Sequence, residues 1–223
     1  MPLSDRDYMQ QRPRQSSRRS FKLDLGMNPV WALIIANVAL FLAVELSSQS
    51  LYPFGPLGQV SADRFTYYLG LIPYYFTDRP WTLVTSMFIH SGFGHLFGNM
   101  ITLFFFGMFF NRLVGGARLL LVYFIGGIVG NLVYLLLGND FSVVIGASGA
   151  IYAITGAMVV MVPRLTVNLY FLFPVPLWIV VLVFFVAWSF VPGVAWQAHL
   201  GGLAAGLIAG FFFRRRIRVD FYR

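Results

Sequence analysis

A serine and a histidine occur in two apolar runs of this chain, where polar side chains are costly. Ser148 lies in the run 143–162, and His199 lies just inside the start of the run 196–213. A polar or ionisable group at membrane depth is by default a functional-site hypothesis. An imidazole can take the proton of a hydroxyl and so activate its oxygen as a nucleophile. The two residue types together suggest catalysis inside a membrane.

If Gly146 and Ala147 form the turn into a helix, the first turn of that helix contains Ser148. Gly146 and Gly149 flank it, and glycine permits unusual backbone angles and close approach. In a first turn the Ser148 N–H has no partner within the helix and can face a developing negative charge. Tyr152 follows one turn later on the same face, where its ring can stack on an imidazole. A serine in an apolar helix is by itself most often structural, so these neighbours carry the argument.

His199 begins a helix face of small residues. Gly202, Gly206 and Gly210 continue this face. Small residues let two membrane helices approach closely, so we expect the helix of His199 to lie against the glycine-rich helix of Ser148. A lone histidine near a helix end is more often a packing residue, and the functional interpretation therefore depends on the pair.

A third polar group stands at the start of another apolar run, 91–111. His95 and Asn99 are four residues apart and share a helix face, with His90 just before them. Asn99 lies within the apolar run and needs a hydrogen-bond partner. Two interpretations stay open: hydrogen bonds between helices, or donors to an oxyanion in company with the Ser148 N–H.

Other mechanisms fit the sequence less well. Three histidines can ligate zinc, but no acidic residue accompanies them at the depth of the apolar runs, and no metal site is predicted. Asp140 stands alone in a loop, and Glu45 is the only acid at the ends of a run, which disfavours both an aspartyl pair and a triad. The chain has no cysteine and implies no cofactor. A dyad remains, in which His199 takes the proton of Ser148 and then gives it to the leaving amine.

The composition is that of a membrane protein with several spans. Of 223 residues, 58% are hydrophobic and 11% are charged, against about 25% charged in soluble domains. Six apolar runs approach or reach the length of a spanning helix. They predict an all-α polytopic membrane protein, a six-transmembrane-helix bundle with spans at 29–46, 91–111, 117–137, 143–162, 175–191 and 196–213.

The positive charge collects on one side of this topology. The net charge is +8, yet only two of the sixteen Lys and Arg residues, Arg64 and Arg79, fall on the outer side. This bias places both termini in the cytoplasm and favours anionic lipid headgroups over nucleic acid as the partner. We therefore expect a disordered basic tail at 1–28, a catalytic domain at 29–213 and a second basic tail at 214–223.

Together these motifs resemble those of the rhomboid intramembrane serine proteases. The resemblance covers about 29–213, with one motif on each of the second, fourth and sixth expected spans. The motifs are His90-x₄-His95-x₃-Asn99, then Gly146-x-Ser148-Gly149-x₂-Tyr152, then Ala198-His199-x₂-Gly202-x₃-Gly206.

The resemblance implies a role for each motif. Ser148 would be the nucleophile, His199 the base, and Tyr152 the ring that packs on it. His95 and Asn99 would serve the oxyanion.

It also implies the roles of the surrounding elements. Gly202 and Gly206 would bring the sixth helix against the fourth, the loop at about 50–80 would be embedded in the membrane, and the fifth span would gate the substrate. One departure is that Trp81 is not followed by the arginine of a Trp-Arg pair that many members have, and the nearest arginine is Arg79.

The resemblance implies cleavage of single-span membrane proteins near small residues in or beside the bilayer, here expected in the plasma membrane. The hydrolytic water needs a cavity open to the outside, and we expect its lining to be His90, His95, Asn99, Ser148 and His199. A catalytically inactive rhomboid-like protein that binds membrane clients is the alternative, but it would be expected to lack the serine or the histidine. A transporter would show inverted repeats, and none is evident. The oligomeric state stays open.

Overall fold

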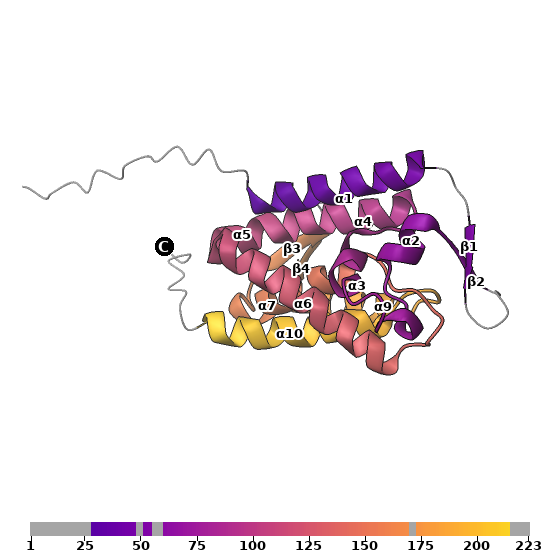
Figure 1. The fold of residues 1–223 in the computed structure, drawn as a ribbon. Coiled ribbons are helices and arrows are strands. Elements are labelled where there is room, and N and C mark those ends of the chain that lie inside the picture. The colour runs from indigo at the N-terminus through magenta and orange to yellow at the C-terminus, as the bar shows by residue number, and fades with distance from the viewer. Residues whose placement is uncertain (1–27, 48–50, 55–59, 170–172, 215–223) are drawn as a thin grey trace, which may run out of the picture.

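The computed structural model describes residues 28–47, 51–54, 60–169 and 173–214. The expected basic tails lie almost wholly outside these residues. Helices dominate the described chain, and α1 lies alongside α4 at one side of the bundle with α10 at the other, α6 and α7 between them (Figure 1). The expected helical class of membrane protein is confirmed.

Four helices are long and apolar enough to cross a membrane, and they match the first, second, third and sixth expected spans. They are α1 (Pro29–Leu46), the continuous helix Phe93–Val114, α6 (Gly116–Leu137) and α10 (Trp196–Arg214). The second of these is built from α4 (Phe93–Thr102), the π-helical turn η6 (Leu103–Gly107) and α5 (Met108–Val114). The side chain of Asn28 caps α1 by accepting from the Val30 N–H at 3.0 Å, and Pro29 suits its first position.

Two shorter apolar helices stand where the fourth and fifth spans are expected. They are α7 (Ser148–Met161) and the segment Leu177–Ser189, made of α8 (Leu177–Ile179), the π-helical turn η7 (Val180–Phe185) and α9 (Val186–Ser189). We call this segment the fifth segment. Because both are shorter than the four long helices, the count of six spans stays a prediction.

The expected start of the fourth span at 143 is wrong by five residues. Val144 is extended and pairs with Leu71 through two backbone hydrogen bonds of 2.9 and 3.1 Å. Gly146 then has a φ of +114°, in the region that favours glycine, so a helix cannot run through it. The helix begins at Ser148 for this reason.

Two short hairpins lie in connecting segments and have no counterpart in the expected elements. Each pairs two antiparallel strands of four residues, which is too short to leave a periodic pattern in the sequence. They are β1 (Leu51–Phe54) with β2 (Val60–Asp63), and β3 (Thr166–Leu169) with β4 (Phe173–Pro176).

Helix α7 forms the centre of the bundle and packs against α10 through glycines. A Cβ atom on Gly202 would lie 2.0 Å from the carbonyl oxygen of Gly149, and one on Gly206 would lie 2.1 Å from that of Ala153. Helix α6 approaches the other side, where a Cβ on Gly126 would lie 2.1 Å from the Ala153 Cβ. We call this contact of α6, α7 and α10 the glycine interface. Its backbones touch, so their spacing is set without adaptable side chains.

Arg79 anchors the loop that precedes α4, although it is not adjacent to Trp81. Its guanidinium is buried between the rings of Tyr67 and Tyr75, 4.5 and 4.4 Å from their centroids. It also donates to the Tyr67 carbonyl oxygen. The Trp81 indole donates to the Tyr68 carbonyl at 3.1 Å. The two side chains therefore hold α2 (Arg64–Leu69) from both sides of Pro80.

The remaining short helices of this loop lead into α4, and the last of them contacts the turn before Ser148 through the Ser86 carbonyl. They are η4 (Pro73–Tyr75), α3 (Thr82–Thr85) and η5 (Ser86–Phe88).

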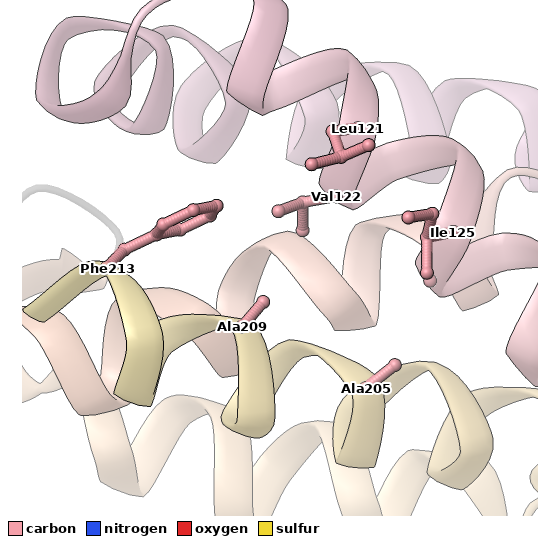
Figure 2. Close-up of a pocket in the computed structure, with 7 residues that line it drawn as sticks. Leu121, Val122, Ile125, Ala205, Ala209 and Phe213 are labelled. Atoms are coloured by element: carbon pink, nitrogen blue, oxygen red, sulfur yellow. The ribbon is translucent and has the colours of Figure 1, made fainter.

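The groove between α6 and α10 is lined by apolar residues. Figure 2 shows Leu121, Val122 and Ile125 facing Ala205, Ala209 and Phe213 across it. Its lining therefore cannot carry acid, base or nucleophilic chemistry. The candidate chemistry lies at the other end of these helices, where α7 and α10 begin.

Candidate active site

The turn before α7 determines where the Ser148 side chain points. The Gly146 N–H donates to the Ser86 carbonyl oxygen at 2.9 Å, which ties this turn to η5. Ala147 has helical angles, and Ser148 is the first residue of the helix. The Ser148 N–H is thus one of the helix's unpaired amides and is available to an anion.

The structure brings Ser148 and His199 together from two helices. The Ser148 Oγ lies 2.7 Å from the His199 Nε2, a hydrogen-bond distance suited to proton transfer. His199 is buried in the first turn of α10, and its backbone N–H donates to the Ala195 carbonyl. Tyr152 stacks on the imidazole with ring centroids 4.2 Å apart and an interplanar angle of 19°. The imidazole plane is therefore held on one face by an aromatic ring.

The other nitrogen of His199 contacts a residue that the sequence analysis missed. Ser189 ends α9, and its Oγ lies 3.0 Å from the His199 Nδ1. The same hydroxyl lies 3.0 Å from the Tyr152 hydroxyl oxygen and 3.0 Å from the Phe185 carbonyl. The sequence does not link Ser189 to His199, because a serine ten residues before a histidine has no helical or strand spacing to it. A polar residue at the end of an apolar run was the only available signal.

His95 and Asn99 reach the same turn from α4. A Cβ atom on Gly146 would lie 2.7 Å from the His95 Nε2 and 3.6 Å from the Asn99 Nδ2, so both nitrogens border this turn. Asn99 donates one amide hydrogen to the His95 carbonyl at 3.1 Å, which leaves its second one unused. His95 and Asn99 therefore lie next to Gly146, which is two residues before Ser148 in the chain.

Ser91 is a second contact that the sequence analysis missed. Its Oγ lies 3.1 Å from the His95 Nδ1. With Ser91 as the donor, the His95 proton sits on Nε2, the nitrogen that faces Gly146. The ring then donates, and does not accept, on the side that faces Gly146.

His90 packs against His95 at the start of α4. It is buried, its ring meets the His95 ring edge-on with centroids 5.0 Å apart, and neither of its nitrogens hydrogen-bonds another protein atom. Burial, and then the neighbouring His95, lower the pKa of His90 to about 4. His90 is therefore a neutral packing partner of His95 at neutral pH.

Among the described residues, no three His, Asp or Glu side chains lie close enough together to hold a metal ion. The hydrogen-bond partners of the His199 ring are hydroxyl groups on both sides. What the arrangement can do is move a proton between Ser148 and a buried imidazole, next to a turn bordered by nitrogen donors.

Comparison with known proteins shows which family the chain belongs to. A family model described as the Rhomboid domain matches residues 77–216, more than half of the chain. The putative rhomboid protease YdcA of Bacillus subtilis (strain 168) is 37% identical over 133 residues, which cover 59% of this chain and 66% of the relative.

Two relatives from Arabidopsis thaliana differ in what their names say. RHOMBOID-like protein 4 is 36% identical over 139 residues, 60% of this chain and 34% of the relative. Inactive RHOMBOID-like protein 8 is 35% identical over 78 residues, 35% of this chain and 22% of the relative. The chain spans about two thirds of the length of YdcA and about a third of the length of RHOMBOID-like protein 4.

Proposed function

Because the chain belongs to the rhomboid family, we propose that it is an intramembrane serine endopeptidase that uses a dyad of Ser148 and His199. The observation that carries this proposal is the 2.7 Å contact between the Ser148 Oγ and the His199 Nε2, under the stacked ring of Tyr152. A nucleophile within hydrogen-bond reach of an oriented base is the geometry that covalent acyl transfer needs.

The reaction begins when His199 Nε2 accepts the Ser148 proton as the Oγ attacks the carbonyl carbon of the scissile peptide. A tetrahedral intermediate forms, with its negative charge on the former carbonyl oxygen. The C–N bond then breaks, and the imidazolium gives its proton to the leaving amine. Water, activated by the same nitrogen, hydrolyses the acyl-enzyme and returns Ser148 to its hydroxyl form.

The negative charge of the intermediate needs donors, and three groups border its place. The Ser148 N–H points out of the start of α7, the His95 Nε2 faces Gly146, and Asn99 has one unused amide hydrogen. Preorganised donors of this kind typically contribute about 10²–10³ each in rate. We assign the oxyanion role to these three groups.

Water must reach the acyl-enzyme within the bilayer. We place its path in a cavity open to the outer side, lined by the polar side chains His90, His95, Asn99, Ser148 and His199. No cofactor or metal takes part in this scheme.

The chain is an integral membrane protein. We propose that its substrates are single-span membrane proteins that enter from the bilayer, past the loop anchored by Arg79 and the fifth segment. We further propose that both termini face the cytoplasm at the plasma membrane, because the Lys and Arg bias has this sense. Nucleic acid has no part in this function.

The alternative function is that of a catalytically inactive protein that binds membrane clients. A relative named as inactive occurs in the same family. Against this alternative stands the intact contact between Ser148 and His199.

Reconstitution with a single-span substrate tests the proposal. The wild-type protein should cleave it, and both Ser148→Ala and His199→Ala should be inactive while remaining folded. Cleavage that persists in Ser148→Ala overturns the serine mechanism. A chelator-treated wild-type sample serves as the control, and loss of its activity would point to a metal instead.

A further inference from the structure

We propose that Ser189 is a positioning residue that orients the imidazole of His199 and fixes which of its nitrogens carries the proton. This inference rests on the proposed function, because it concerns the base of the same dyad. In a triad this task belongs to an acidic residue bonded to the Nδ1–H of the histidine. Here a neutral hydroxyl from the fifth segment stands at that nitrogen, 3.0 Å away.

The surroundings of Ser189 make its hydroxyl an effective partner. The residue is fully buried, and so is His199 except for 6% of its surface. In a buried site a hydrogen bond is not exchanged for one with water, and an unpaired donor carries its full desolvation cost. The Nδ1–H of His199 therefore depends on the hydroxyl of Ser189.

The protons of the network can be placed without conflict. For Nε2 to accept the proton of Ser148, the proton of neutral His199 must sit on Nδ1, which then donates to the Ser189 Oγ. The Ser189 hydroxyl hydrogen is left to point at the Tyr152 hydroxyl oxygen or at the Phe185 carbonyl.

The Tyr152 hydroxyl, the last of the network, donates to a backbone carbonyl. Tyr152 donates its own hydroxyl hydrogen to the Phe185 carbonyl at 2.5 Å. Phe185 is the last residue of η7, and a π-helical turn frees backbone groups from their regular helical partners. Every polar hydrogen of the hydrogen-bond network that runs from the His199 Nδ1 to the Phe185 carbonyl thus has an acceptor.

Removal of the Ser189 hydroxyl leaves two poor options for His199. Its Nδ1–H can stay buried without a partner, or the proton can move to Nε2, where it faces Ser148 and blocks proton transfer. An unsatisfied buried donor costs about 1–3 kcal/mol. Since each 1.4 kcal/mol is about a factor of ten in rate, we expect kcat to fall about tenfold to a hundredfold.

The test measures kcat and KM of the full chain in liposomes with a single-span substrate. Ser189→Ala should lower kcat by about 10–10² with KM within about twofold of wild type, because the substrate is not contacted. Ser189→Thr keeps the hydroxyl and should recover most of the rate.

The matched control is Thr155→Val. Thr155 is a fully buried hydroxyl of α7 that bonds the carbonyls of Ile151 and Tyr152 and makes no hydrogen bond to the His199 ring. Its removal should leave kcat near the wild-type value. Equal losses in Thr155→Val and Ser189→Ala would show a general cost of removing a buried hydroxyl and would overturn the proposal.

Nitrogen NMR of His199 gives a readout that a purely structural role would not move. Wild type should show the proton on Nδ1 in a hydrogen bond, and Ser189→Ala should shift population to the Nε2–H form. The same tautomer populations in both proteins, or a kcat of Ser189→Ala within about twofold of wild type, overturn the role of Ser189. If Ser189→Ala does not fold, the wild-type spectrum decides, and absence of a hydrogen-bonded Nδ1 proton overturns it.

The two proposals fail in different ways. Activity that survives Ser148→Ala removes the serine mechanism and the role of Ser189 with it. An inactive Ser148→Ala beside a fully active Ser189→Ala leaves the protease standing and removes only the positioning role.

Discussion

The glycine interface and the fifth segment hold the same histidine in different ways. In the glycine interface, backbones touch, and Gly202 and Gly206 of α10 lie directly against α7. The fifth segment contains a π-helical turn and exposes large apolar side chains, among them Phe184 and Trp188. The first region fixes the distance between Ser148 and His199, whereas the second contacts the His199 imidazole through Ser189. Distance and orientation are thus set by separate parts of the molecule.

The largest effect should come from a side chain placed inside the glycine interface. In Gly206→Leu, a Cβ atom would lie 2.1 Å from the Ala153 carbonyl oxygen, so α10 must move away from α7. We expect a lower thermal unfolding midpoint and a loss of at least about 10² in kcat, because a shift of about 1 Å in a catalytic group has that cost. Differential scanning fluorimetry and the substrate assay measure the two effects.

Phe184→Ala and Gly98→Ala are the controls for this variant. Phe184 of the fifth segment is 54% exposed, and a Cβ on Gly98 meets no atom within 4 Å. Both should unfold within a few degrees of wild type. If Phe184→Ala lowers the midpoint as much as Gly206→Leu, the contrast between the two regions is wrong.

The next effect concerns the proposed oxyanion donors on α4, which belong to neither region. Asn99→Ala should lower kcat by about 10–10³, since it removes one preorganised donor. The unfolding midpoint should change little, because the hydrogen bond that Asn99 makes is to the His95 carbonyl of its own helix. Kinetics with a single-span substrate measure the effect, and an unchanged kcat would remove Asn99 from the oxyanion role.

Much of this arrangement can be predicted from sequence because it follows from periodicity. The small-residue face after His199 predicts close packing with the helix of Ser148, and the i,i+4 spacing places His95 and Asn99 on one face. The start of α7 was misplaced because an apolar residue such as Val144 looks the same in a strand as in a helix. Ser189 could not be found, since its meeting with His199 depends on how the fifth segment folds back onto α10.

Asn131 offers a smaller test on the side of the glycine interface. It projects from α6 and donates to the Leu83 carbonyl at 2.8 Å and to the Ser86 Oγ at 2.9 Å. The carbonyl of Ser86 in turn accepts from Gly146, so Asn131 supports the turn before Ser148. Asn131→Leu should cost about 1–3 kcal/mol of stability, because it removes two hydrogen bonds, one of them to the hydroxyl of the buried Ser86.

A denaturation series on Asn131→Leu and on Asn37→Leu separates support of the site from general burial. Asn37 is buried like Asn131, but it donates to the Leu33 carbonyl of its own helix, α1. Both variants should be destabilised, and only Asn131→Leu should also lower kcat. Equal kcat values in the two variants would contradict the link from α6 to Gly146.

The smallest effect is a pH dependence of stability that arises at His90. Burial lowers the pKa of His90 to about 4 in the folded protein, against about 6.5 in the unfolded chain. Between these values the unfolded state binds more protons, so His90 makes stability rise with pH from about 4 to about 6.5 and has no effect on the slope above it. Unfolding midpoints of wild type and His90→Asn over this range measure the contribution. The wild-type midpoint should fall more steeply on acidification, because the variant has no imidazole to protonate at this position. Parallel profiles would mean that His90 is already charged in the fold, which its contact with His95 and its burial argue against.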